Sequence, residues 1–149
     1  MSKITVNVAD GAAFKTYDDV LQHIHAVQTA AGIVKNTYLD GLREREADYP
    51  TGIQLEGYSV AIPHCDSKHA ISPAIYIIRL PDAVEVNEAD GDGKLWVNLV
   101  INLVVTDPND QLQLLKALFN HLQLADFYEK LLSLPAEEAK AMFINTIIK

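Results

Sequence analysis

The segment VAIPH at positions 60–64 is the part of this sequence whose residue types most suggest chemistry. It places His64 directly after a short apolar run and Pro63. Sites in α/β proteins lie at strand ends, and the fixed φ of proline gives His64 a stiff backbone support. A neutral imidazole keeps one nitrogen unprotonated as a nucleophile. The pattern therefore predicts a candidate site at His64, although a lone histidine after a strand is more often structural.

Cys65 directly follows this histidine and is the single cysteine of the chain. A thiol beside an imidazole suggests a Cys-His nucleophile pair. Adjacent residues in an extended chain point to opposite faces, so we predict that Cys65 is buried packing. A Cys65/His64 hydrolase stays the weaker alternative, because the sequence contains no recognisable oxyanion motif.

Histidine spacing argues against a metal site. His64, Cys65 and His69 lack the second close ligand pair of a zinc site. His23 and His25 lie two positions apart in a predicted helix, where their side chains diverge by roughly 200°. We therefore expect neither a metal nor a cofactor.

The helices before His64 follow from apolar periodicity. One helix is predicted over Tyr17–Gly32, where the glycine marks the end and five apolar residues share a face: Val20, Leu21, Ile24, Val27 and Ala31. A second helix is predicted from a cap at Asn36 or Thr37 to about Ala47. It ends there because the residue before a proline, here in the Tyr49-Pro50 pair, is biased away from helix.

Three β-rich runs follow, at Ser59–Pro63, Ala74–Leu80 and Leu95–Val105. The segments between them are rich in turn-forming residues. The DGDG sequence at positions 90–93 resembles a calcium loop but lacks its ligand spacing and terminal Glu, so it is predicted to be a turn.

The last third of the chain is predicted to be helical. Asp107 and Pro108 suit the cap and first position of a helix. Apolar residues then recur at helical spacing: Leu112, Leu115, Phe119 and Leu122. Two more helices are predicted, over Asp126–Leu132 and Pro135–Ile147, the second with an inward stripe of Ala139, Met142, Phe143 and Ile147.

The order of helices, strands and helices predicts the fold class. Nearly continuous apolar strands need cover on both faces of their sheet. We therefore predict an α/β fold, a three-layer α/β/α sandwich around a central mixed sheet. With 149 residues and no internal repeat, a single domain over 1–149 is expected.

Composition limits the partners. The net charge of −8 repels nucleic acid and anionic lipid, and no cluster of Lys or Arg offsets it locally. The longest apolar run, Val97–Val105, is interrupted by Asn98 and Asn102 and is far shorter than the roughly 20 residues of a membrane helix. Met1–Asn7 lacks the features of a signal peptide. One cysteine forms no internal disulfide, so a cytoplasmic location is expected.

Four segments together resemble a known family: Arg45-Glu46, YPTG at 49–52, VAIPHCD at 60–66 and PAIY at 73–76. They are similar to the fructose/mannitol class (type 2) of enzyme IIA domains of the sugar phosphotransferase system. The hallmark of that class is a glycine-containing turn, a short apolar strand and Pro-His. The similarity extends over nearly the whole chain.

Within that class the chain most resembles the galactitol branch. The features that it shares with this branch are the longer turn at 53–58, Pro-His-Cys at 63–65 and the pair His69-Ala70. The resemblance implies that His64 is phosphorylated by the carrier HPr. It also implies transfer to a cysteine of enzyme IIB, which serves uptake of galactitol or a related polyol through the membrane enzyme IIC.

Three residues are candidates for stabilising the phosphoryl group. Arg45 matches the Arg-Glu position of the family; it is either a charged donor to phosphoryl oxygens or a solvated charge at a helix end. The family's second histidine aligns with Gln111, which is either a neutral donor near the helix dipole or an exposed first-turn residue. His69 is the other candidate for the missing imidazole, with a solvent-facing position as its alternative.

A regulatory module is the main alternative to a carrier. The same fold and histidine would then report the phosphorylation state by binding a transcription factor or kinase. Regulatory forms tend to be fused to DNA-binding domains or to act in nitrogen control, and this sequence shows no second domain.

Overall fold

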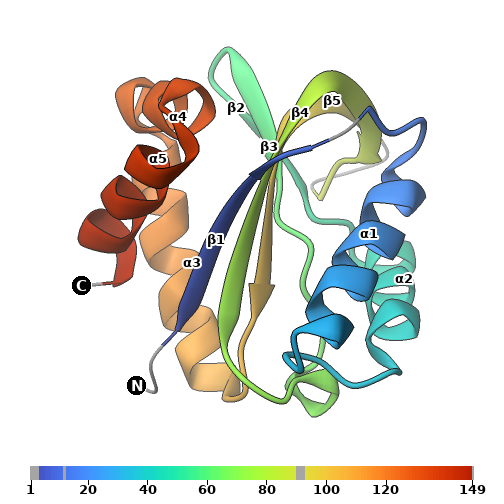
Figure 1. Cartoon of the computed structure of the whole chain (residues 1–149). Helices are drawn as coiled ribbons and strands as arrows, with labels where there is room; N and C mark the ends of the chain where they lie inside the picture. The colour runs from blue at the N-terminus through green and yellow to red at the C-terminus, as the bar shows by residue number, and fades with distance from the viewer. Residues whose placement is uncertain (1–3, 12, 90–92, 149) are drawn as a thin grey trace.

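A computed structural model describes residues 4–11, 13–89 and 93–148. Its centre is a five-stranded sheet in the order β1-β4-β5-β3-β2 (Figure 1). The strands are β1 Thr5–Asp10, β2 Gly52–Leu55, β3 Tyr58–Ala61, β4 Ala74–Asn87 and β5 Lys94–Val104. The β1–β4 and β3–β5 pairs are parallel, and the β2–β3 and β4–β5 pairs are antiparallel. The predicted mixed sheet is confirmed.

Helices cover both faces of this sheet. In Figure 1, α1 and α2 lie on one face and α3, α4 and α5 on the other. Their bounds are α1 Tyr17–Ala30, α2 Tyr38–Asp48, α3 Pro108–Leu122, α4 Ala125–Ser133 and α5 Ala136–Phe143. A 3-10 turn at Ser67–His69 and a π-helical turn at Ile144–Ile148 complete the described elements. The predicted three-layer α/β/α sandwich is therefore confirmed. Among the described residues, no helix is both long and apolar enough to cross a membrane.

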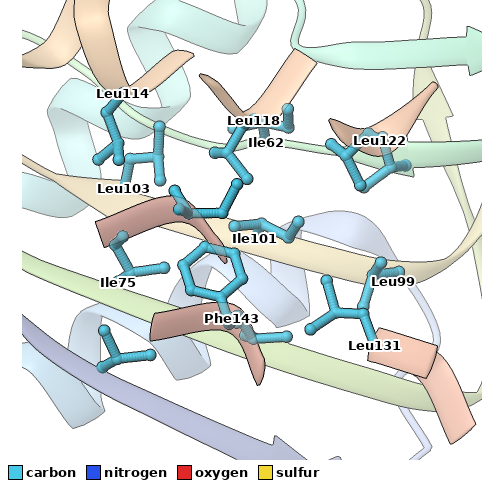
Figure 2. Close-up of a cluster of buried hydrophobic side chains, with 14 of the residues drawn as sticks. Ile62, Ile75, Leu99, Ile101, Leu103, Leu114, Leu118, Leu122, Leu131 and Phe143 are labelled. Carbon is cyan, nitrogen blue, oxygen red and sulfur yellow. The ribbon is translucent and has the colours of Figure 1, made fainter. Parts of the chain in front are cut away.

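Alternation along β5 divides the core in two. Leu99, Ile101 and Leu103 pack with α3, α4 and α5, as Figure 2 shows around Phe143. The alternate residues of this strand face α1 and α2, and these are Val100, Asn102 and Val104. Because successive side chains of a strand point to opposite faces, one apolar run supplies both cores.

Local signals fix the predicted helix ends. Thr16 caps α1 in a capping box with Asp19. Gly32, the predicted stop, has a φ of 73° just after α1. Asp107 caps α3 by accepting a hydrogen bond from the amide of Asn109, with Pro108 in the first turn. The predicted helix start at Asp107 and Pro108 is confirmed.

Two strands, β1 and β2, were not predicted from the sequence. The segment 53–58, predicted to be a turn, instead contains β2 and a tight turn in which Gly57 has a φ of 85°. β4 does not end at Leu80 but continues to Asn87 past an irregularity between Arg79 and Val84. The predicted turn at 90–93 falls largely on residues 90–92, which lie outside the described residues.

Two helical details also differ from prediction. On α3 the buried residues are Leu114, Leu118 and Leu122, whereas Leu112 and Phe119 are 50% and 42% exposed. Thr37 begins α2 without a side-chain cap, because its hydroxyl pairs with a histidine ring.

Candidate active site

His64 lies just beyond the end of β3, close to the first turn of α3. The amide of Leu103 donates to the carbonyl of Pro63 at 3.1 Å. The amide of Ile62 donates to the carbonyl of Thr51 at 3.2 Å. Strand β5 and the residue just before β2 therefore hold the backbone before His64, and His64 is only 8% exposed.

One hydrogen bond determines the tautomer of His64. Nδ1 lies 2.7 Å from the carbonyl oxygen of Ile62. A carbonyl oxygen only accepts, so Nδ1 carries the proton and the lone pair of the neutral ring is on Nε2. Burial, and secondarily the charge of Arg45, lower the pKa of His64. The ring is therefore neutral at pH 7, and the lone pair on Nε2 is available for nucleophilic attack.

Arg45, in the last turn of α2, places its guanidinium beside this nitrogen. Its Nη2 lies 3.4 Å from Nε2 of His64. Its Nη1 donates to the carbonyl of Tyr49 at 2.6 Å, and the guanidinium lies 5.5 Å from the centre of the Tyr49 ring. The helix end thus positions a fork of donors beside the nucleophilic atom.

Glu46, the next residue, points away from the site and fixes its support. Its carboxylate accepts hydrogen bonds from the Thr51 amide at 3.1 Å, from the Thr51 hydroxyl, and from the hydroxyl of Tyr17 at 3.1 Å. Burial raises the pKa of Glu46. Since Thr51 in turn accepts from Ile62, this carboxylate anchors the backbone that leads to His64.

A hollow of about 380 Å³ opens in front of His64. Its lining brings together Arg45, His64 and Gln111, three of the residues singled out from the sequence, along with Cys65, Asp66 and Pro108. Gln111 is in the first turn of α3, so its amide and the positive end of the helix dipole both lie at this hollow. The arrangement offers a nucleophile, a cation and a neutral donor around one space large enough for a phosphoryl group.

His69 does not line this hollow. Its Nδ1 pairs with the hydroxyl of Thr37 at 2.8 Å. Its ring packs on Gly41, where an added Cβ would meet Cδ2 at 2.6 Å and Nε2 at 2.8 Å. It lines a neighbouring, smaller hollow with Arg45 and Lys68. The structure therefore gives His69 the position of a contact between its loop and α2.

Cys65 is 9% exposed, which confirms the prediction of buried packing. Burial, and to a lesser extent the charge of Asp66, raise the pKa of its thiol to about 12. Since the thiolate is the nucleophilic form, Cys65 is unreactive near pH 7.

Two supporting residues escaped the sequence interpretation. Glu46 entered it as part of a motif, without a role. Asn102 entered only as an interruption of an apolar run, yet its amide donates to the carbonyl of Pro63 at 3.1 Å. A polar residue inside an otherwise apolar strand was the available signal, because such a residue must find partners in the core. Among the described residues, no three His, Cys, Asp or Glu side chains are placed to hold a metal ion.

Comparison with known proteins identifies relatives of this chain. Residues 4–146 match the family model described as "Phosphoenolpyruvate-dependent sugar phosphotransferase system, EIIA 2". The galactitol-specific EIIA component of Escherichia coli is 42% identical over 141 residues, which span 95% of this chain and 94% of that protein.

Solved structures share the fold at lower identity. Enzyme IIA of the mannitol system of Escherichia coli, solved in complex with phosphorylated enzyme IIB, is 18% identical. It superposes with a TM-score of 0.72, covering 95% of this chain and 94% of the other. The nitrogen regulatory protein IIA-Ntr of Neisseria meningitidis is 19% identical with a TM-score of 0.68, covering 93% and 91%.

Proposed function

The chain belongs to the EIIA 2 family of the phosphoenolpyruvate-dependent sugar phosphotransferase system, and from this premise we propose that Nε2 of His64 is its phosphoryl acceptor. Arg45 and Gln111 stabilise the bound group. The proposal rests most on the hydrogen bond of Nδ1 to the Ile62 carbonyl, since it leaves the lone pair on Nε2 inside the hollow.

The transfer itself is a displacement at phosphorus. The lone pair of His64 Nε2 attacks the phosphoryl group of a phosphohistidine on HPr. The donor N–P bond breaks as the new one forms, the donor ring leaves with its electron pair, and nothing is oxidised or reduced. In the onward step a cysteine thiolate of enzyme IIB attacks the same phosphorus, and Nε2 recovers its lone pair.

Electrostatics favours the phosphorylated state of His64. Phosphorylation brings negatively charged oxygens next to Nε2, where Arg45 supplies charged hydrogen-bond donors. Gln111 adds an amide donor from the first turn of α3. His64 keeps its Nδ1 proton throughout, because the Ile62 carbonyl holds it.

The partners follow from the relatives. The 42% identical Escherichia coli protein is named galactitol-specific, and the mannitol relative was solved bound to phosphorylated enzyme IIB. This chain therefore accepts phosphate from HPr and donates it to an enzyme IIB that serves galactitol or a related polyol. Its link to the membrane enzyme IIC is indirect. We propose that residues 1–149 act as one domain in the cytoplasm.

Two alternatives are less well supported. A regulatory module would have the same fold, as the similarity to IIA-Ntr illustrates, but the 42% identity is to a transport component. A Cys65/His64 hydrolase would need a thiolate, whereas burial keeps the Cys65 thiol protonated.

Phosphoryl transfer in a purified system tests the proposal. The protein is incubated with enzyme I, HPr and phosphoenolpyruvate, and mass spectrometry is expected to find one acid-labile phosphate. His64→Ala should accept none, whereas His69→Ala should still accept one. Subsequent transfer to a galactitol-type enzyme IIB separates the carrier from the regulatory module. Stoichiometric labelling of folded His64→Ala would overturn the assignment.

A further inference from the structure

A buried polar network crosses the layer between the sheet and helices α1 and α2. Its centre is Asn102 on β5, which is fully buried, and it includes Gln28 and Tyr38, which are 5% and 2% exposed. The Nε2 of Gln28 donates to Oδ1 of Asn102 at 3.0 Å. Nδ2 of Asn102 donates to the Tyr38 hydroxyl at 2.8 Å and to the Pro63 carbonyl at 3.1 Å. Both N–H donors of the Asn102 amide and one lone pair of its oxygen are thus occupied.

These bonds allow one orientation of the Asn102 amide. The Pro63 carbonyl only accepts, so the atom that faces it must be the NH₂ group. Oδ1 then faces Gln28, whose NH₂ group supplies the matching donor. Tyr38 in turn donates to the carbonyl of Leu103 at 3.5 Å. The network therefore ends, on the side of the site, at the peptide group that joins Pro63 to His64.

Satisfying the backbone does not require this asparagine. The Pro63 carbonyl already accepts a hydrogen bond from the Leu103 amide at 3.1 Å. The neighbouring positions on the same face of β5 are Val100 and Val104, so aliphatic side chains fit this layer. A buried amide in such a place gives little net stability over an apolar side chain of its shape. What it adds is a second donor, which fixes the direction of the Pro63 carbonyl.

Two consecutive carbonyls then determine the placement of His64. The Ile62 carbonyl accepts from the ring at Nδ1, and the Pro63 carbonyl is held by Leu103 and Asn102. A change at the Pro63 peptide would move the His64 Cα and lengthen the ring's bond to Ile62. We propose that Asn102 is a positioning residue, which keeps Nε2 of His64 as the unprotonated, hollow-facing nitrogen by holding the peptide before it. This inference rests on the proposed function of His64.

The test compares the centre of the network, Asn102, with the residue at its far end, Gln28. Asn102→Leu removes the donor to Pro63 while nearly keeping the side-chain shape. Gln28→Leu is the matched control, because it removes the bond to Oδ1 but leaves Asn102 free to donate to Pro63. Each variant is measured for its melting temperature, for single-turnover phosphorylation by phospho-HPr, and for the ¹⁵N chemical shifts of the His64 ring.

We expect Asn102→Leu to slow the maximal transfer rate by about 10- to 100-fold with little change in the HPr concentration needed for half-saturation. Its ring ¹⁵N shifts should move from a single Nδ1-protonated form to a mixture of tautomers. Gln28→Leu should stay within about threefold of wild type and keep the Nδ1-protonated form, at a comparable loss of melting temperature. Equal rates and identical ring shifts in the two variants would overturn the inference.

Two further measurements apply if Asn102→Leu does not fold. If Asn102→Leu does not fold, Asn102→Val is used, since a β-branched residue suits a strand. If that also fails, wild type is examined for the scalar coupling between Asn102 Nδ2 and the Pro63 carbonyl carbon; its presence supports the inference and its absence overturns it. The ring shifts are read on unphosphorylated protein. Failure of wild type to accept phosphate would thus sink the proposed function without deciding the role of Asn102.

Discussion

Nη2 of Arg45 lies 3.4 Å from Nε2 of His64, while Nη1 of the same guanidinium donates to the Tyr49 carbonyl at 2.6 Å. The cation is thus attached to its own helix end and directed at the nucleophilic nitrogen. In the free protein its charge helps to lower the pKa of His64 and so to keep the ring neutral. Under the proposed function the same guanidinium would face the phosphoryl oxygens after transfer, so we expect one contact to favour both states of the histidine.

Removing this cation should slow transfer. A hydrogen bond to a charged group contributes about 1.5 to 3 kcal/mol, so Arg45→Met should lower the single-turnover rate from phospho-HPr by about 10- to 150-fold. Arg43→Met is the matched control on the same helix. Arg43 is 45% exposed and pairs with Asp18, which is 46% exposed, so its loss should change the rate less than about threefold. Equal rates for the two variants would remove Arg45 from the site.

Gln111 is expected to contribute as a neutral donor. Gln111→Ala should slow transfer by about 5- to 30-fold, corresponding to roughly 1 to 2 kcal/mol. Gln111→His should be tolerated and add a pH dependence near neutrality, because an imidazole titrates there. The exposed neighbour Gln113, on the same helix, supplies the control Gln113→Ala. If the transfer rates of Gln111→Ala, both from phospho-HPr and to enzyme IIB, equal those of Gln113→Ala, then Gln111 is only a surface residue.

The pH dependence of His64 has a definite sign. Burial and the charge of Arg45 lower its pKa, so Nε2 stays unprotonated until the pH falls below the usual value of about 6.5. The free energy of unfolding contributed by this shift is fully present above the unfolded pKa and is lost as the pH falls through the folded pKa. NMR titration of the ring should give a midpoint below 6.5 in wild type and a higher one in Arg45→Met. A wild-type midpoint at or above the ordinary value would contradict the geometry.

Gly41 should resist substitution although it lies inside a helix. Alanine is the better helix former by about 1 kcal/mol, yet its Cβ would lie 2.6 Å from the His69 ring and 3.0 Å from Cys65 Sγ. Gly41→Ala should therefore lower the free energy of unfolding in urea and slow phosphoryl transfer by displacing the loop after His64. Combining it with His69→Ala should recover much of both losses. A fully stable Gly41→Ala single variant would show that the contact is not tight.

Local signals predicted much of the fold. Asp107 with Pro108, and Gly32, mark helix ends through interactions within a few residues, and these were confirmed. Strand β1 was missed because Val6 is its only buried residue, so its apolar pattern is weak. Its partner strand β4 also lies about seventy residues further along the chain. The buried face of α3 was predicted only in part, because Leu122 is buried as expected whereas Leu112 and Phe119 are exposed. Packing on the sheet, and not the spacing, selects Leu118 over Phe119.

The candidate site was likewise predicted from the sequence only in part. His64, Arg45 and Gln111 were chosen from motif positions, and the structure brings them to one hollow. The placement of His69 on Gly41 could not be predicted, because it depends on side-chain packing between a loop and a helix that are distant in sequence. The role inferred for Asn102 depends in the same way on a contact between residues distant in sequence, here its side chain and the Pro63 carbonyl.

The central claim is that phosphate is carried on one atom, Nε2 of His64. The protein is labelled with ¹⁵N-histidine and phosphorylated by enzyme I, HPr and phosphoenolpyruvate, and the coupling between ³¹P and the ring nitrogens is recorded by NMR. We predict a one-bond coupling to Nε2 of His64, with the proton retained on Nδ1 beside the Ile62 carbonyl. A one-bond coupling to Nδ1 of His64, or to a nitrogen of any other histidine, would contradict this account.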